Sequence, residues 1–482
     1  MGSTEITNLS ATELSANIWS KAVSAREVMA AYLERIAVVN PKHNAIVNLA
    51  DEELLLSLAA AKDDELVAAL ADGRTVGWMH GMPQAIKDLA DVAGFATTLG
   101  SRLFGQQPAA RDGLMASRMR ASGCIVVGKT NVPEFGLGSH TFNEVFGTTA
   151  NAYDRSKTAG GSSGGAAVAL ATRMLPVADG SDYMGSLRNP AAWNNVFGFR
   201  PSQGRVPSWP ANDSWVAQLA TEGPMGRTVA DVGSLLDVQA GYDRRVPLSI
   251  ADGSRFNGDL RSFSCEGVRV GWLGDLDAYL PMEPGILAVC NDGLRHLESV
   301  GCRVDPASFG YPAEKVWDAW RVWRAWLVGP KIRPLVDTPE RRSLVKPEAL
   351  WELEQSDRLS AEGITTASAT RSAFYQHILT LFDGFDVLVL PTAQVWPFDA
   401  TQRWPTSINE TTMDTYHRWM EVVLYATFAG LPCMSAPVGF GRDELPMGMQ
   451  IIGGPRADLF VLQVASAYEQ AVGPILSTRP PE

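Results

Sequence analysis

The chain has 482 residues, of which 46% are hydrophobic and 20% charged, a composition that supports a large core and argues against disorder. Its formal net charge is −12, so it lacks the basic face that binding to nucleic acid or to an anionic membrane requires. Its five cysteines are widely spaced and form no CxxC pair, which indicates reduced, buried thiols and argues against a metal site.

Residues 1–23 lack the basic start and the uninterrupted apolar stretch of a signal peptide. No apolar run elsewhere approaches the roughly 18 residues that a membrane span needs. We therefore expect a cytoplasmic protein without a membrane partner.

Helices and short apolar strands alternate through the first third of the chain. Ser10 and Ser24 are predicted N-caps, and Glu27, three residues after Ser24, completes a capping box. The predicted elements are helices over 11–23, 25–40, 51–73 and 112–123, and strands over 45–50, 82–87 and 124–130. The strand over 82–87 ends at Lys87.

The alternation continues to the C-terminus without a clear linker. Predicted helices cover 166–175, 228–241, 284–301, 415–432 and 458–472, and predicted strands cover 268–274, 302–306, 385–393 and 446–454. This pattern predicts an α/β fold whose sheet is covered on both faces. Because strands at both ends of the chain need a shared sheet, we predict one continuous domain.

Residues 123–130, GCIVVGKT, match the phosphate-loop pattern G-x-x-x-x-G-K-[ST]. A phosphate loop exposes the backbone N–H groups of its middle residues, which must therefore be loop. Here the middle is Ile125-Val126-Val127, which is typical of a strand. The context argues against nucleotide binding.

Residues 160–164, GGSSG, match the nucleophile elbow G-x-S-x-G. An elbow directly follows a strand, whereas residues 151–159 are polar and turn-like. By chain order only His296, His377 and His417 could complete a Ser-His-Asp triad, and each lies in a segment that we predict as helix. A histidine-dependent serine hydrolase is therefore an alternative that the sequence disfavours.

Four tryptophans, Trp317, Trp320, Trp323 and Trp326, recur every three residues. The spacing favours a helix that packs on the core. The alternative interpretation is an aromatic wall of a substrate pocket, and both can hold at once.

The segment over 160–207 combines glycines, hydroxyl groups and a tight turn beside an apolar helix. Glycines on both sides of Ser162 and Ser163 let the backbone approach other groups closely. The turn before Ser186 can aim successive backbone N–H groups at a developing oxyanion. A lysine becomes a usable base when burial lowers its pKa well below the reference value of about 10.4, and Lys87 is the candidate.

With these residues the chain resembles the amidase signature hydrolases. Their pattern joins a GGSSGG loop to a second stretch, here GSDYMGSLRNPA, and the separation 186 − 162 = 24 fits that pattern. The likeness covers about residues 8–472 and includes KTNVPEFGLGSHTFNEVFGTTANAYD and GLPCMSAPVGFGRDELPMGMQIIGG. It implies a single domain over 1–482, with a signature core at about 80–210 and a central mixed, twisted β-sheet flanked by helices on both faces.

The resemblance also implies a Ser–cisSer–Lys triad. Ser186 is the implied nucleophile, Ser162 the bridging serine after a cis peptide bond, and Lys87 the base. The implied oxyanion hole is made by the backbone N–H groups of Tyr183, Met184, Gly185 and Ser186. The implied supporting residues are Gly161, Ser163, Asp182 and Arg188. The chain departs from the family pattern at Ser181, which replaces threonine, and at Met184, which replaces a glycine and does not readily adopt a positive φ.

From the resemblance we expect hydrolysis of small-molecule amide bonds through an acyl-enzyme, with aryl amides, esters and carbamates as further substrates, and without a metal or cofactor. The expected substrate contacts are Leu137, Gly138, Trp209 and Trp215, and Met184 is a further apolar candidate. The alternative is the amidase-family subunit of a tRNA-dependent glutamine amidotransferase, which works with partner chains. The family includes monomers and homodimers, and both states stay open.

Overall fold

The computed structural model describes residues 1–258 and 260–481. Its main sheet has eight strands: β6 (Ala178–Asp182), β7 (Phe197–Arg200), β8 (Thr221–Gly226), β9 (Arg269–Trp272), β10 (Arg303–Pro306), β11 (Val387–Pro391), β14 (Cys433–Phe440) and β15 (Pro446–Gly453). Their spatial order is β10-β9-β11-β15-β14-β7-β8-β6. The first three strands in this order run parallel and the remaining pairs run antiparallel, so the sheet is mixed.

A second sheet has three strands: β1 (Ile46–Val47), β2 (Pro83–Lys87) and β3 (Ile125–Thr130). Strand β3 is central, antiparallel to β1 and parallel to β2. Strand β2 also contacts β6, the last strand of the main sheet. The end of β2, and with it Lys87, therefore lies beside the strand that leads into the turn before Ser186. Two short hairpins complete the strands: β4 (Phe142–Asn143) with β5 (Gly147–Thr148), and β12 (Ser407–Ile408) with β13 (Thr411–Thr412).

Helices cover both faces of the main sheet. One face carries α6 (Gly164–Ala171) and α7 (Arg188–Trp193), and the other carries α8 (Val229–Gln239), α9 (Ile286–Ser299) and α15 (Asp458–Ala471). Two glycines of β15 show which helices pack on each face of the sheet. A Cβ atom at Gly448 would meet Ala192 of α7, whereas one at Gly453 would meet Val461 of α15. Side chains an odd number of residues apart point to opposite faces of a strand, so the sheet is buried between the two helical layers.

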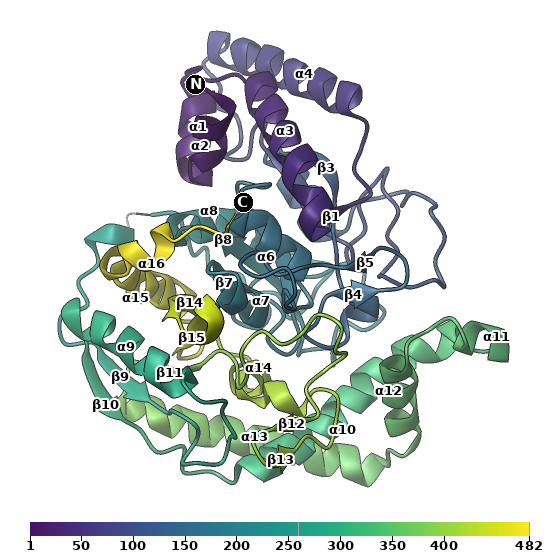
Figure 1. Cartoon of the computed structure of the whole chain (residues 1–482), viewed down its shortest axis with the longest axis vertical. Coiled ribbons are helices and arrows are strands. Elements are labelled where there is room, and N and C mark those ends of the chain that lie inside the picture. Colours follow the sequence, from purple (N-terminus) through teal and green to yellow (C-terminus); the bar gives the residue numbers. More distant parts are fainter. Residues whose placement is uncertain (259, 482) are drawn as a thin grey trace.

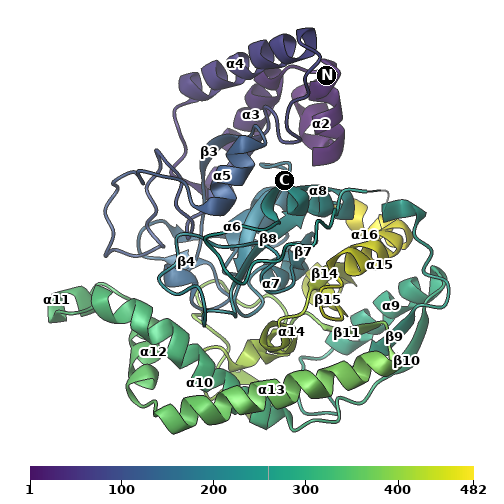
Figure 2. The same cartoon turned by 180° about the vertical axis from the view of Figure 1, so that it is seen from behind.

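Further helices lie at opposite ends of the molecule (Figure 1). One group gathers near the small sheet: α1 (Ser3–Asn8), α2 (Ala11–Trp19), α3 (Ala25–His43), α4 (Glu52–Ala71) and α5 (Leu114–Ala121). The other group forms the far end, also visible from behind in Figure 2: α10 (Ala313–Ile332), α11 (Pro339–Arg342), α12 (Pro347–Asp357) and α13 (Ala361–Gly384). The helices α14 (Leu424–Ala429) and α16 (Gly473–Ser477) are short.

Most predicted elements are present, and the predicted fold class is confirmed. Ser10 and Ser24 cap α2 and α3 through capping boxes with Glu13 and Glu27. Residues 125–130 form strand β3, as the argument against a phosphate loop requires. The expected strand over 45–50 shrinks to two residues in β1.

Several parts of the chain differ from the prediction, and the elements that were not predicted include β6, β7, β8, α11, α12 and α13. In place of the helix expected over 415–432 the structure has a 3₁₀ segment, Arg418–Val423, followed by α14; within the 3₁₀ segment Met420 lies outside helical backbone geometry. Strand β14 was not predicted. Pro437 and Gly439 within it argue against a strand, and the structure places a β-bulge between them.

Candidate active site

Lys87 is the last residue of β2, and its side chain is buried inside the protein. All five residues of β2 are buried, and Lys87 itself is 1% exposed. The backbone N–H of Lys87 donates to the carboxylate of Asp179 on β6, at 3.1 Å. This contact fixes the strand end, so the four methylene groups of the lysine carry its nitrogen into the interior.

The Lys87 nitrogen is surrounded by hydroxyl and carbonyl oxygens. Nζ lies 2.8 Å from Ser162 Oγ, 2.8 Å from Ser163 Oγ and 3.0 Å from Ser181 Oγ. Burial lowers the pKa of Lys87 to about 7, although the carboxyl groups nearby raise it. The amine is therefore neutral in a large fraction of molecules near neutral pH and can accept a proton.

The glycine-rich loop before α6 is held against a neighbouring loop. The Gly161–Ser162 peptide bond is cis. Ser139 Oγ donates to Gly161 O at 2.7 Å and accepts from Gly161 N at 3.2 Å. At Gly165 a Cβ atom would lie 2.5 Å from the backbone nitrogen of Asn131. Glycine at this position lets the start of α6 pack directly on backbone, which is one reason for the density of glycine in the segment.

Ser186 lies in the turn between β6 and α7. Gly185 has φ of +84°, while Met184 stays outside the left-handed region, so the methionine does not strain the turn. Asp182 accepts hydrogen bonds from Gly185 N at 2.8 Å and from Leu187 N at 3.2 Å. Ser163 N donates to Ser186 O at 3.2 Å. The turn is thus tied to the end of β6 and to the start of α6.

Two buried arginines hold the carboxylate of Asp182. Arg188 donates to it through Nε and Nη2, both at 3.0 Å, and Arg200 Nη1 donates to the carbonyl of Asp182. Burial alone would disfavour the carboxylate, but the two guanidinium groups hold the pKa of Asp182 well below its usual value. Asp182 therefore remains ionised and keeps the Ser186 turn in one conformation.

Ser186, Ser162 and Lys87 line one cavity of about 390 Å³. Its apolar wall includes Phe135, Leu137, Val328, Ile332 and Leu335. Polar groups at its surface include Tyr183, Ser208, Glu222 and Arg324. The cavity has the size and mixed character of a small-molecule site.

Of the four residues expected to contact the substrate, one lines the cavity and three do not. Leu137 lines the cavity. Gly138 faces Tyr416 instead, and Trp215 is 66% exposed. Trp209 stacks on the guanidinium groups of two arginines, Arg111 and Arg245. Among the described residues, Gly138, Trp209 and Trp215 are not part of the cavity wall.

The tryptophan series belongs to α10 and faces the core. Trp317, Trp320 and Trp323 are buried, and Trp326 packs against the same core. Helix α10 does line the cavity, but through Arg324, Val328, Lys331 and Ile332. Within the described chain the cavity wall therefore contains none of the four tryptophans, and it also lacks Met184, which is buried in the core.

Several cavity residues were not identified from the sequence. Phe135 and Gly136 lie in the family-like segment that precedes Leu137, so a signal was present there. Glu222 is the first residue of EGPMGRTVADVGSLLD, a further stretch that resembles the family, so a signal was present there too. Arg324 lies within the tryptophan series and carries no motif of its own. These side chains come from distant segments, and only the packing of α10, β8 and the 134–137 turn brings them together.

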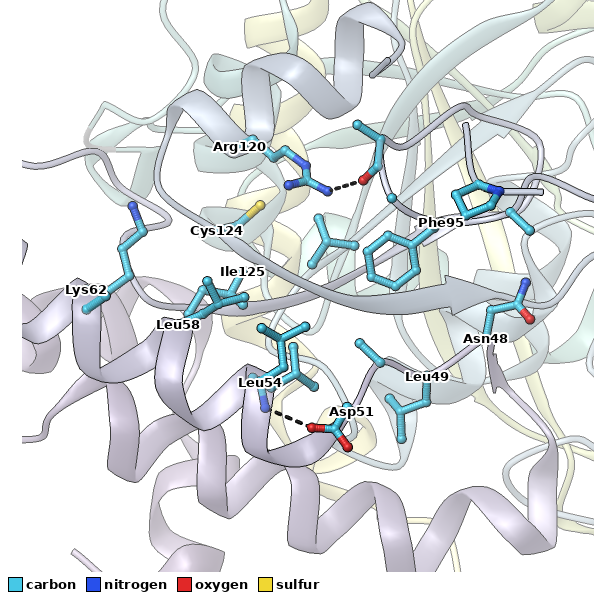
Figure 3. A pocket seen from close by; sticks show the side chains of 18 of the residues that line it. Asn48, Leu49, Asp51, Leu54, Leu58, Lys62, Phe95, Arg120, Cys124 and Ile125 are labelled. Atoms are coloured by element: carbon cyan, nitrogen blue, oxygen red, sulfur yellow. Dashed lines mark hydrogen bonds between the residues drawn. The ribbon is translucent and has the colours of Figure 1, made fainter. Parts of the chain in front are cut away.

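A larger cavity of about 870 Å³ lies between α4 and β3 (Figure 3). Figure 3 shows Leu54 and Leu58 of α4 beside this space, with Ile125 next to Leu58 and Phe95 across from Leu54. Burial raises the pKa of the Cys124 thiol to about 12, so this cysteine is not a thiolate nucleophile. The wall contains none of the triad candidates, and we place the candidate active site in the smaller cavity.

The histidines of the alternative triad lie elsewhere. Within residues 1–258 and 260–481, His296, His377 and His417 are absent from the cavity wall that holds Ser162 and Ser186. In the same part of the chain, no group of three or more histidine, cysteine, aspartate or glutamate side chains is placed to hold a metal ion. No described helix is long and apolar enough to cross a membrane.

Comparison with known proteins gives matches along nearly the whole chain. The Amidase family profile matches residues 27–462. An acylamidase from Rhodococcus erythropolis is 33% identical over 479 residues, covering 98% of this chain and 97% of that protein. A glutamyl-tRNA(Gln) amidotransferase subunit from Rhodococcus erythropolis (strain PR4 / NBRC 100887) is 32% identical over 508 residues, covering 98% and 99%. The crystal structure of a bacterial aryl acylamidase of the amidase signature family superposes with a TM-score of 0.89 at 29% identity, covering 98% and 99%.

Proposed function

Since the chain belongs to the amidase signature family and is an amide hydrolase, we propose that it cleaves small-molecule amides with Ser186 as nucleophile, Ser162 as proton relay and Lys87 as base. One observation carries the assignment. The Lys87 nitrogen lies 2.8 Å from Ser162 Oγ, and both residues line the cavity that also contains Ser186. A serine nucleophile that shares one cavity with a buried lysine, whose nitrogen contacts a second hydroxyl group there, supports acyl transfer by such a relay.

The proposed reaction proceeds by two acyl transfers. Neutral Lys87 takes the proton of Ser162 while Ser162 takes the proton of Ser186, so that Ser186 Oγ attacks the carbonyl carbon. The C–N bond then breaks, and the amine leaves with a proton returned through Ser162. Water attacks the resulting ester by the same relay, releases the carboxylic acid and restores Ser186.

The proposed oxyanion hole is the turn before the nucleophile. The backbone N–H groups of residues 183–186 would stabilise the oxygen that becomes negative in each transfer, and loss of one such donor typically costs about 10²–10³ in rate. The contacts of Asp182 with Gly185 N and with Arg188 support this role because they hold the turn rigid. In the same proposal Gly161 and Ser163 support the loop that carries Ser162.

The proposed substrates are amides with an aromatic or alkyl group, including anilides, and also esters and carbamates that present the same carbonyl. The apolar wall around Leu137 and the similarity to an acylamidase and an aryl acylamidase support this class. The amidotransferase alternative is less favoured. It predicts a chain that needs partner chains, whereas the proposed hydrolase acts alone.

The test uses the purified chain alone. It is assayed against anilides, alkyl amides, esters and carbamates, and then treated with a serine-reactive phosphonate. We expect hydrolysis of at least one amide class, and a label on the peptide that contains Ser186. The Ser186→Ala variant should lose the label and at least ~10⁴-fold in kcat while keeping its fold. A label on another peptide with concomitant loss of activity would refute the assignment.

A further inference from the structure

Glu222 is a carboxyl group in the candidate active site to which the proposed mechanism gives no role. It lies on β8, where it is paired directly opposite Ser181 of β6 in antiparallel register. Directly opposed residues point to the same face of a sheet. Since Ser181 Oγ contacts the Lys87 nitrogen at 3.0 Å, Glu222 lies on the Lys87 side of the cavity.

One oxygen of the Glu222 carboxyl group is left unsatisfied by the part of the chain that the structure describes. Its Oε2 atom is buried and has no hydrogen-bond partner among the described residues. The two cations whose charges act on it are engaged elsewhere. Lys87 contacts serine oxygens, and Arg118 donates to the carbonyls of Gln239 and Gly241. A buried carboxyl oxygen without a hydrogen-bond partner lowers the stability of the protein. A bound molecule that donates a hydrogen bond to this oxygen would remove that cost and bind more tightly as a result.

The surroundings favour a neutral partner over a cation. Burial, together with the neighbouring Asp179, raises the pKa of Glu222 to about 8, while Lys87 and Arg118 act in the opposite sense. Near neutral pH the carboxyl group is therefore largely protonated, and its carbonyl oxygen accepts hydrogen bonds without attracting a positive charge.

The position of Glu222 also selects one half of the substrate. In the proposed reaction the leaving nitrogen takes its proton from Ser162, which contacts Lys87. The amine half must therefore extend from the reacting carbon toward the side of the cavity that holds Lys87 and Glu222. The apolar wall, which contains Leu137 and Val328, remains for other parts of the substrate.

We propose that Glu222 is a specificity-determining residue that accepts a hydrogen bond from an N–H donor carried by the amine half of the substrate. The preferred substrates are then amides of aromatic amines that bear a second, uncharged amino group, such as monoacylated aromatic diamines. This inference rests on the proposed function, because it assumes that the amine half leaves on the Ser162 side.

The test compares 4-aminoacetanilide with 4-methylacetanilide, which differ in the donor and little in size. Both are assayed with the wild type, Glu222→Leu and Glu222→Gln, and the ratio of their kcat/KM values is compared between proteins. The two anilines differ in leaving ability, but this difference is the same in every variant and drops out when the ratios are compared. Any effect of Glu222 on Lys87 acts on both substrates and cancels within each ratio. A second pair, the anilides of 4-aminobenzoic and 4-methylbenzoic acid, carries the same groups on the acyl half.

We expect the ratio to fall about tenfold in Glu222→Leu, mainly through KM for the amino substrate, as for loss of one hydrogen bond. Glu222→Gln keeps an acceptor oxygen and should keep the ratio within about twofold. An unchanged ratio in Glu222→Leu, or selectivity confined to the acyl-half pair, would overturn the proposal. Hydrolysis of 4-methylacetanilide by all three proteins shows that they fold and that the proposed function holds. If the wild type hydrolyses other amides but neither acetanilide, this inference is refuted while the proposed function stands.

Discussion

Lys87 Nζ and Ser162 Oγ lie 2.8 Å apart in the interior, where the lysine side chain is almost completely shielded from water. The amine meets hydroxyl and carbonyl oxygens there and makes no direct contact with a carboxylate among its described hydrogen bonds. Desolvation therefore outweighs the charges of the nearby carboxyl groups, and the pKa of Lys87 falls to about 7.

The pH dependence of activity should follow this amine. Below its pKa Lys87 is an ammonium group and has no capacity to accept a proton, so kcat/KM for a neutral amide should rise with pH through about 7 and then level off. A rate profile without a rise across neutral pH would contradict Lys87 as the base.

The two adjacent serines make a matched pair of variants. Ser162 and Ser163 both lie 2.8 Å from the Lys87 nitrogen, but only Ser162 belongs to the described cavity wall. We expect Ser162→Ala to lower kcat by on the order of 10³ or more, because the relay is broken. Ser163→Ala should cost far less. Equal losses in steady-state assays of the two variants would assign both hydroxyl groups to the relay.

Asp182 should matter to stability as well as to the turn before Ser186. Asp182→Asn leaves Arg188 and Arg200 buried without their carboxylate, which we expect to cost about 3–5 kcal/mol in the free energy of unfolding. Urea denaturation measures this loss. Because the pKa of Asp182 is held low in the folded state, the wild-type advantage should be present at neutral pH and shrink only in acid. A variant as stable as the wild type at neutral pH would refute the argument.

The placement of the apolar residues predicts which of them affect substrate binding. Leu137→Ala enlarges the cavity wall and should raise KM for anilides by about tenfold, as for loss of part of a buried apolar contact. Trp215→Ala changes an exposed side chain outside the described wall and should alter kcat and KM by less than about twofold. The reverse pattern would place the aromatic contact at Trp215 after all.

The sequence predicted those elements whose formation depends on residues close together in the chain. The serine caps of α2 and α3 follow from hydrogen bonds within four residues, and β2 and β3 follow from short apolar runs. The broken helix after residue 415 and strand β14 were not predicted. The break at Met420 has no glycine or proline to mark it. The bulge in β14 lies beyond Cys433–Ser435, the residues that pair with β7, so β14 pairs there with β15 alone and the irregular stretch is tolerated.

The sequence by itself determined the family, the α/β class and the identity of the triad candidates, because the serine-glycine loop, the turn before Ser186 and the lysine at a strand end form a long linear pattern. The tertiary structure alone decided the cavity wall. It excluded Trp209 and Trp215 and admitted Glu222, Arg324 and Phe135. Hydrophobicity indicates that a side chain avoids water but not which surface it covers, and that choice depends on how distant segments pack.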